Sequence, residues 1–495
     1  MKKRILWILA LGAFVVLGGA AVWMGGLNQD EGWYLYAANL VAEGKMPYRD
    51  FFYTQGPLLP VVYSAFVRVW AEWGLLGARL FTLALGAAGI VFASALAWRL
   101  APDGRRGAAA LVAFLLLGAN IYHVYYVTIP KTYALAGLFV VVGFYMLGFL
   151  SVGARGVVGA LFGVGAGLSL AFAAGTRISL GAMLCTTGLW MLFSRQWRNL
   201  VFFCVGGFAG LALVYGPFVA DPGALRGLLA AQAYHAARGG SDPVWTVGSL
   251  SRLVRWYLPL FIVLALGFAR SRGAVPPCVR LLLWSFAAVF FVQMLAPFPY
   301  EDYQVPIMGA LAVAAAVLYA GGSGDALPVS ANLAEVLVAA LAFATSFGSP
   351  LLEKWSVNGH DRFWSLKKDR YELAQLRDVA AKIEALDPGG KELFTQDVYL
   401  AVETGRKVPE GLEMGPYAVL SDADCERLAR EAKAPVAALS GYSFAVEMPK
   451  GTERPIDKQM KCWELLKENY KLEDRIPYFG QNSTTLLILK RKREE

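Results

Sequence analysis

Histidine is scarce in this sequence of 495 residues, which contains only His123, His235 and His360. The three are far apart along the chain and do not have the spacing of a metal site. Neither a GxxxxGK[ST] phosphate loop nor a GxSxG nucleophile elbow occurs. The sequence therefore gives no support for a histidine-held metal centre, a P-loop nucleotide site or a hydrolase nucleophile of these common types.

Cysteine is nearly as infrequent, with five residues. Cys185, Cys204 and Cys278 lie in or beside apolar runs, so we expect them to be small buried side chains. Cys425 and Cys462 fall in the polar C-terminal part of the chain. They can pair if that part faces an oxidising compartment, and the alternative is two free thiols.

Charged residues are also few, at 17% of the chain, whereas hydrophobic residues make up 57%. This balance exceeds what a soluble globular protein carries and indicates a polytopic α-helical membrane protein. Residues 1–348 contain 22 Lys and Arg against 12 Asp and Glu, and residues 349–495 contain 24 against 25. The basic residues of the first part lie in short gaps between apolar runs, so we expect them to mark cytoplasmic loops rather than to bind nucleic acid.

Apolar runs of about 20 residues, the length that crosses a bilayer, predict eleven spans in residues 1–348. They lie near 5–26, 78–100, 107–122, 132–150, 156–175, 178–194, 200–220, 256–270, 281–298, 304–320 and 331–348. The first run is longer than the core of a secretory signal, so we expect an uncleaved anchor. The basic gaps place the N-terminus in the cytoplasm and the C-terminus outside the plasma (inner) membrane.

The first outer loop, residues 27–77, contains an apolar segment over residues 57–74 that is too short and too charged for a span. It carries Arg68 and Glu72 with Trp70 and Trp73. Charge mixed with aromatic anchors is typical of a helix that lies on the membrane surface. We therefore predict an interfacial helix here.

Residues 349–495 are polar enough to form a separate, soluble domain on the outer side. Helical spacing predicts helices in WSLKKDRYELAQLRDVAAKIEAL and DADCERLAREAK. The segments ELFTQDVYLAV, APVAALS and TTLLILKRKR have the composition of strands. Alternating helices and strands predict a small extracytoplasmic α/β domain.

Two adjacent carboxylates, Asp30 and Glu31, follow the first span directly. A carboxylate at a membrane boundary can act as a general base, as a ligand of a divalent metal ion, or as both when two stand together. The alternative is that the pair only solvates the end of the span.

Two cations, Lys131 and Arg177, lie at the outer ends of otherwise apolar helices, on the face where Asp30 and Glu31 are expected. Ionisable groups at such places are costly and are candidates for function. Arg can hold a phosphate through two parallel hydrogen bonds, and Lys acts as a point charge. The alternative for each is a side chain that reaches toward lipid headgroups.

The segment DEGWYLYAANLVAEGKMPYRDFFYTQGPLLPVVYSAF resembles the first outer loop of membrane glycosyltransferases of the C-type (GT-C) superfold. It is most similar to the bacterial branch that includes relatives of protein O-mannosyltransferases and aminoarabinose (ArnT-like) transferases. ARLFTLALGAAGIVFASALAWRL and YEDYQVPIMGALAVAAAVLYA resemble later spans of that family, and FTQDVYLAVETGRKVPEGLEMGPYA resembles its outer domain. The resemblance covers most of residues 1–320 and part of the tail.

This resemblance implies inverting transfer of a sugar from a polyprenyl-phosphate donor to a glycan, lipid or protein acceptor on the outer face. Asp30 would be the catalytic carboxylate, and Glu31 would help to bind the acceptor or a divalent metal ion. Lys131, Arg177 and Tyr303 would meet the donor phosphate, although the acidic neighbours of Tyr303 oppose a direct contact there. Further residues expected to line the site are Arg49, Asp50, Tyr53, Gln55, Glu301 and Asp302.

Two other functions remain as alternatives. A transporter or flippase of lipid-linked sugars would show paired half-sequences or helices broken at mid-membrane, and the sequence shows neither. A non-catalytic assembly scaffold would not bind a lipid-linked donor. Because fold alone does not define function, the preference for a transferase depends on carboxylates and cations gathered on one face.

Overall fold

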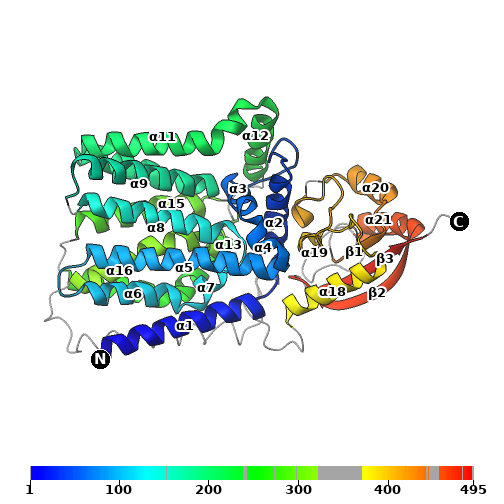
Figure 1. The fold of residues 1–495 in the computed structure, drawn as a ribbon, viewed down its shortest axis with the longest axis horizontal. Helices are drawn as coiled ribbons and strands as arrows, with labels where there is room; N and C mark the ends of the chain where they lie inside the picture. The colour runs from blue at the N-terminus through cyan, green and yellow to red at the C-terminus, as the bar shows by residue number, and fades with distance from the viewer. Residues whose placement is uncertain are drawn as a thin grey trace.

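A computed structural model of the chain describes residues 2–151, 153–237, 242–271, 275–296, 298–321, 371–418, 420–441, 444, 456–481 and 483–492. It has two parts, a bundle of long helices and a smaller domain of helices and strands at one end of the bundle (Figure 1). The short helices α2, α3 and α4 lie between these two parts (Figure 1).

The bundle lies within residues 2–321, and the regular elements among its described residues are all helices. Its elements are α1 (Lys2–Met24), α2 (Gln29–Ala42), α3 (Leu58–Ala65), α4 (Val67–Trp70), η1 (Ala71–Trp73), α5 (Gly74–Leu100), α6 (Arg106–Gly118), α7 (Ile121–Tyr126), α8 (Thr132–Ser151), α9 (Gly156–Thr176), η2 (Ile178–Leu180), α10 (Gly181–Phe193), α11 (Trp197–Ala220), α12 (Pro222–Ala236), α13 (Pro243–Trp256), α14 (Leu258–Arg270), α15 (Pro277–Met294), η3 (Glu301–Gln304) and α16 (Val305–Gly321). Within the apolar window of α16, 94% of the residues are buried, so this helix forms the centre of the bundle.

Seven stretches among the described residues are long and apolar enough to cross a membrane, or eight if one bent pair is counted as a single span. They confirm the predicted spans near 5–26, 78–100, 132–150, 156–175, 200–220, 281–298 and 304–320. The predicted spans near 107–122 and 178–194 form shorter apolar helices, and the span near 256–270 belongs to the bent pair α13 and α14, whose axes differ by 77°. The predicted span at 331–348 lies outside the described residues.

The segment predicted as one interfacial helix, residues 57–74, forms several short elements instead. Its second half, α4 and η1, continues into α5, and Val67–Leu100 is a single candidate span. The Trp70 side chain is fully buried and its Nε1 donates to the Tyr63 carbonyl at 3.0 Å, so it cannot act as a membrane anchor. Trp73 is exposed, as an anchor requires.

The C-terminal domain combines helices with a three-stranded antiparallel sheet of order β1-β3-β2. Its elements are α18 (Glu372–Leu386), α19 (Val398–Thr404), η5 (Gly415–Tyr417), α20 (Asp422–Glu431), β1 (Val436–Leu439), α21 (Ile456–Asn469), β2 (Tyr470–Phe479) and β3 (Thr484–Arg491). The helices predicted around α18 and α20 and the strands predicted around β1 and β3 are confirmed.

The prediction of a strand in ELFTQDVYLAV is wrong, because this segment continues as helix α19 after Asp397. Only Glu392 and Phe394 make isolated bridge pairs before the turn. Val398, Leu400 and Ala401 are all buried, because α19 packs against α2 of the bundle as well as against its own domain. Tertiary contact on several sides, which the sequence alone does not reveal, overrides the strand-like composition.

The two cysteines of the C-terminal domain lie together. Cys425 on α20 and Cys462 on α21 are both buried, and their thiols form a hydrogen bond with each other. This hydrogen bond and burial raise the pKa of the Cys425 thiol. The thiols are free in this structure, and their pairing stays a prediction.

Candidate functional site

A cavity of about 1050 Å³ lies between the end of the bundle and the C-terminal domain. Its lining is mostly polar and aromatic and comes from both parts of the chain. The lining residues are Asn28, Asp30, Trp33, Tyr34, Thr54, Gln55, Lys131, Tyr133, Arg177, Tyr234, Tyr300, Asp302, Tyr303, Met414, Tyr417 and Gln481. The structure thus brings together six of the residues predicted for the site: Asp30, Gln55, Lys131, Arg177, Asp302 and Tyr303.

Asp30 lies in the first turn of α2, at the cavity wall. Asn28 caps this helix, and its side chain accepts a hydrogen bond from the backbone N–H of Asp30 at 3.0 Å. The two Asp30 carboxylate oxygens are held by different donors, one by Trp33 Nε1 at 3.0 Å and the other by Lys131 Nζ at 2.9 Å. With 22% of its side chain exposed, Asp30 is ordered by these contacts and still accessible from the cavity.

Lys131 connects Asp30 to a second carboxylate of the cavity lining, that of Asp302. Its Nζ lies 2.9 Å from Asp30 Oδ2 and 3.2 Å from Asp302 Oδ2. The Tyr133 hydroxyl also donates to Asp302 Oδ2, at 2.8 Å, whereas the buried Asp302 Oδ1 has no hydrogen-bond partner among the described residues. One cation between two carboxylates leaves this group of three side chains with a net negative charge.

Glu31, the other half of the acidic pair, points away from the cavity and is fully buried. Arg79 of α5 donates from Nη2 to Glu31 Oε1 at 2.7 Å and from Nε to Oε2 at 2.8 Å. The backbone N–H of Asn28 donates to Glu31 Oε1 at 3.0 Å, which completes a capping box. Both carboxylate oxygens are therefore occupied within the protein.

Arg79 also fixes the end of α1. Its Nη1 donates to the carbonyls of Val22 and Gly25 at 3.1 and 3.0 Å, and its Nη2 donates to Gly26 at 2.9 Å. These carbonyls have no partner within a helix because they lie at its C-terminal end. Arg79 and Glu31 thus join the end of α1, the start of α2 and the start of α5 at one buried point.

Arg177 follows α9 and lines the same cavity as Asp30. Its guanidinium carbon lies 4.3 Å from the ring centroid of Tyr303 and 5.3 Å from that of Tyr133, and Nη1 donates to Thr132 at 3.5 Å. No carboxylate lies within ion-pair distance of Arg177 among the described residues. It is therefore the cation of this cavity that is best able to receive an anionic ligand.

Five residues predicted for the site lie outside the cavity lining. Arg49 and Asp50 form an exposed ion pair at 2.9 Å, and Arg49 also contacts Asp221 at 3.2 Å. Tyr53 is fully buried among the aromatic rings behind the cavity, and Glu301 is paired with Arg252 at 3.0 Å. These contacts, and the pairing of Glu31 with Arg79 described above, direct each side chain away from the cavity.

The C-terminal domain forms hydrogen bonds with α2, the helix that carries Asp30. Gln29 Nε2 donates to Asp397 Oδ1 at 2.9 Å and to the Tyr399 hydroxyl at 3.0 Å, and the Gln29 backbone N–H donates to Gln481 Oε1 at 2.8 Å. A Cβ at Gly32 would lie 2.4 Å from the backbone nitrogen of Tyr399, so only glycine permits this approach. The start of α2 is therefore fixed by the bundle on one side and the C-terminal domain on the other.

Asp397 itself is fully buried, and burial raises the pKa of its carboxyl group. Hydrogen bonds from Ser440, Gln29 and Tyr399 act in the opposite direction. These donors stabilise the charged form of the Asp397 carboxyl group. Because one of the donors is Gln29 Nε2, Asp397 fixes the position of the Gln29 side chain.

A divalent metal ion does not fit the acidic pair as it is arranged here. Both oxygens of Glu31 accept hydrogen bonds, and the position between Asp30 and Asp302 is taken by Lys131 Nζ. The described part of the chain contains no group of three or more His, Cys, Asp or Glu residues that could hold a metal ion.

No family model and no curated relative matches this sequence. The structure is nevertheless similar to that of ArnT from Cupriavidus metallidurans bound to undecaprenyl phosphate, with a TM-score of 0.60 at 14% identity over 97% of both chains. It is also similar to the Archaeoglobus fulgidus oligosaccharyltransferase in complex with Zn and sulfate, with a TM-score of 0.54 at 13% identity over 89% of this chain and 68% of that one.

A third similar structure is archaeal AglB from Archaeoglobus fulgidus in complex with an inhibitory peptide and a dolichol-phosphate. Its TM-score is 0.51 at 12% identity, over 87% of this chain and 69% of that one. At such identities the similarity establishes the fold. The chain is a polytopic helical membrane protein with the fold of the GT-C membrane glycosyltransferases, as its sequence predicts.

Proposed function

We propose that this protein transfers a sugar from a polyprenyl-phosphate donor to a hydroxyl group of a glycan, lipid or protein acceptor. The observation that carries the proposal is that Asp30 and Arg177, a candidate base and a candidate phosphate anchor, face one cavity at the end of the helix bundle. Similar structures contain undecaprenyl phosphate or dolichol-phosphate, which supports a lipid-linked donor.

The donor phosphate would bind at Arg177, whose guanidinium rests on the ring of Tyr303. A planar guanidinium can give a phosphate two parallel hydrogen bonds, and its positive charge stabilises the leaving group as the sugar departs. Lys131 is less suited to this task because Asp30 and Asp302 already neutralise it. Its role is to hold the Asp30 side chain in place.

Asp30 would act as the base. The acceptor oxygen forms a bond to the anomeric carbon of the sugar, the bond from that carbon to the phosphate oxygen breaks, and the acceptor proton passes to Asp30. Attack from the side opposite the leaving phosphate inverts the anomeric configuration. The unpartnered Asp302 Oδ1 is available to accept a hydroxyl of the sugar or the acceptor, and such fixed contacts hold the reacting atoms close together.

Glu31 would be a positioning residue that acts through α2. Its bond to Arg79 orders the first turn of the helix, and the next residue toward the N-terminus is Asp30. We derive no step through a metal ion, because Lys131 supplies the positive charge between the two cavity carboxylates.

The proposal includes an orientation in which the cavity faces the outside and the N-terminus lies in the cytoplasm. Arginines gather at the other end of the bundle, including Arg105 and Arg198, as the positive-inside rule requires of cytoplasmic loops. In intact cells, a membrane-impermeant maleimide should label an Arg105→Cys variant only after the membrane is opened. Labelling before that step would reverse the orientation.

The proposed reaction is tested with purified protein in proteoliposomes and a radiolabelled polyprenyl-phosphate sugar, with cell-envelope extract as the acceptor source. We expect label to move to a water-soluble or less lipophilic product and free polyprenyl phosphate to accumulate. Movement of the intact donor across the bilayer without cleavage would instead identify a flippase. Failure of the donor to bind at all would favour a scaffold.

Replacing Arg177 by glutamine should weaken donor binding. A hydrogen bond to a charged group contributes about 1.5–3 kcal/mol, so we expect the KM for the donor to rise roughly 10-fold to 150-fold. Arg177→Lys should retain part of the affinity as a point charge. Arg226→Gln, which removes an exposed arginine from α12, is the control and should not change KM. An unchanged KM in Arg177→Gln would contradict the phosphate role.

Removal of divalent metal ions should leave transfer unaffected. Lys131 occupies the position between Asp30 and Asp302 that a metal would need. We expect the initial rate in excess EDTA to equal the rate with added Mg²⁺ or Mn²⁺. A loss of activity that only a metal restores would show that Lys131 moves out of this position during the reaction.

A further inference from the structure

A second cavity, of about 580 Å³, lies at the end of the bundle opposite the candidate site. Lys131 of the candidate site immediately precedes α8, whereas Ser151, at the other end of this 20-residue helix, lines the second cavity. At 1.5 Å per residue the two ends are about 30 Å apart, roughly the thickness of the hydrocarbon core. The two cavities therefore belong to opposite faces of the bundle.

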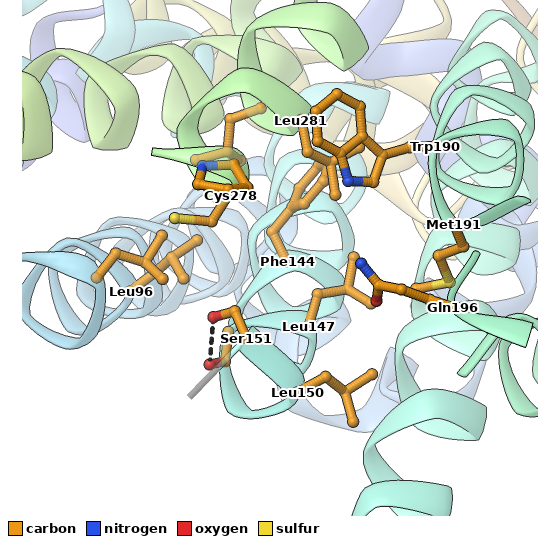
Figure 2. Close-up of a pocket in the computed structure, with 14 residues that line it drawn as sticks. Leu96, Phe144, Leu147, Leu150, Ser151, Trp190, Met191, Gln196, Cys278 and Leu281 are labelled. Carbon is orange, nitrogen blue, oxygen red and sulfur yellow. Dashed lines mark hydrogen bonds between the residues drawn. The ribbon is translucent and has the colours of Figure 1, made fainter. Parts of the chain in front are cut away.

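The interior of this cavity is apolar. Figure 2 shows side chains from α5, α8, α10 and α15 around an open space, with the Cys278 thiol among them. Among the described residues no charged side chain lines the space. Of its polar side chains, the Ser151 hydroxyl donates to the Gly148 carbonyl at 2.8 Å, and Gln196 Oε1 accepts from Asn199 Nδ2 at 3.2 Å. Such a lining offers little to a polar metabolite and favours a hydrocarbon chain.

Two arginines stand at the rim of the cavity. The guanidinium carbon of Arg99 lies 3.3 Å from the ring centroid of Phe149, and a Cβ at Gly148, a lining residue, would lie 3.2 Å from Arg99 Cδ. The guanidinium carbon of Arg280 lies 5.8 Å from the ring centroid of Trp190, which also lines the cavity. Neither arginine has a carboxylate partner among the described residues.

The surrounding loops are basic as well. The described arginines at this end of the bundle are Arg4, Arg99, Arg105, Arg106, Arg155, Arg195, Arg198, Arg270 and Arg280. The described acidic residue near them, Asp103, is already paired with Arg106 at 2.8 Å. Within the described residues, the cationic rim is therefore not neutralised by carboxylates.

We propose that this cavity binds an anionic phospholipid, with an acyl chain in the apolar interior and the phosphodiester against Arg99 and Arg280. Basic pockets between membrane helices on the cytoplasmic side bind anionic headgroups in this way. A zwitterionic lipid would bring an ammonium group toward the same arginines and lose part of the attraction. This site is separate from the proposed transfer reaction and does not depend on it.

The test compares two lipids with identical acyl chains, phosphatidylglycerol and phosphatidylcholine, on delipidated protein in detergent. Binding is measured by native mass spectrometry and by the shift in apparent melting temperature. At about 1 kcal/mol for each of two arginines, we expect phosphatidylglycerol to bind roughly 30-fold more tightly. The double variant Arg99→Gln, Arg280→Gln should lose this preference.

A variant that fills the cavity tests where the lipid binds. Cys278→Phe places a ring in the cavity lining, and Cys185→Phe makes the same change at an exposed position of α10. We expect Cys278→Phe to lower phosphatidylglycerol binding at least 10-fold, and Cys185→Phe to match the unmodified protein. Equal binding of the two lipids by the unmodified protein, or full binding by a folded Cys278→Phe variant, would overturn the proposal.

Discussion

Replacing Asp30 by asparagine is expected to lower the rate of sugar transfer by roughly 10²-fold to 10⁴-fold, the usual contribution of a general base. Asparagine has nearly the same shape, although its single carbonyl oxygen can accept from only one of Trp33 and Lys131. The fold of α2 should persist, because its N-cap is supplied by Asn28. Asparagine cannot take up the acceptor proton. The substitution should therefore lower kcat and leave the KM for the donor nearly unchanged.

The control for this variant is Asp50→Asn, in the same outer loop. Asp50 is held in an exposed ion pair with Arg49 and lies outside the cavity, so transfer should stay at the level of the unmodified protein. An undiminished rate in well-expressed Asp30→Asn would remove the catalytic role.

The convergence of Asp30, Lys131 and Arg177 could be predicted from the sequence because each stands at the end of an apolar run. The order of the spans and the basic gaps place all three ends on one face of the bundle. An ionisable group at such a position is rare enough to attract attention. The same reasoning applies to Asp302, which lies in η3 directly before α16 and lines the cavity.

The separate environments of Asp30 and Glu31 could not be predicted in this way. Adjacent residues on a helix point in directions about 100° apart, since a turn takes 3.6 residues. Asp30 consequently faces the cavity while Glu31 faces the interior between α1 and α5. Their proximity in the sequence suggested a shared role that the helical geometry does not provide.

The sequence indicates that Arg79 has a structural or functional partner, because a charged residue at the start of an apolar span requires one. That partner, Glu31, is 48 residues away and was already interpreted as part of the site. The contacts of Gln29 with Asp397 and Gln481 span more than 360 residues and had no local signal. Contacts of this range depend on how the C-terminal domain docks, which the sequence pattern does not specify.

Replacing Arg79 by methionine is expected to destabilise the protein by about 3–5 kcal/mol, the cost of leaving a buried charge without its partner. Glu31 would remain fully buried, and the carbonyls of Val22, Gly25 and Gly26 would lose their shared donor. A clear fall in the apparent melting temperature, measured in detergent, is the expected result. Arg226→Met, at an exposed position, should leave that temperature unchanged.

The double variant Glu31→Gln, Arg79→Met distinguishes a buried charge from a loss of packing. One explanation for a loss of stability in Arg79→Met is that the buried Glu31 carboxylate is left without a partner. In that case, neutralising Glu31 in the same protein should recover part of the lost stability. If the double variant is no more stable than Arg79→Met, the carbonyls at the end of α1 would account for the effect. In both cases transfer should fall with stability, because this ion pair holds the helix turn that presents Asp30 to the cavity.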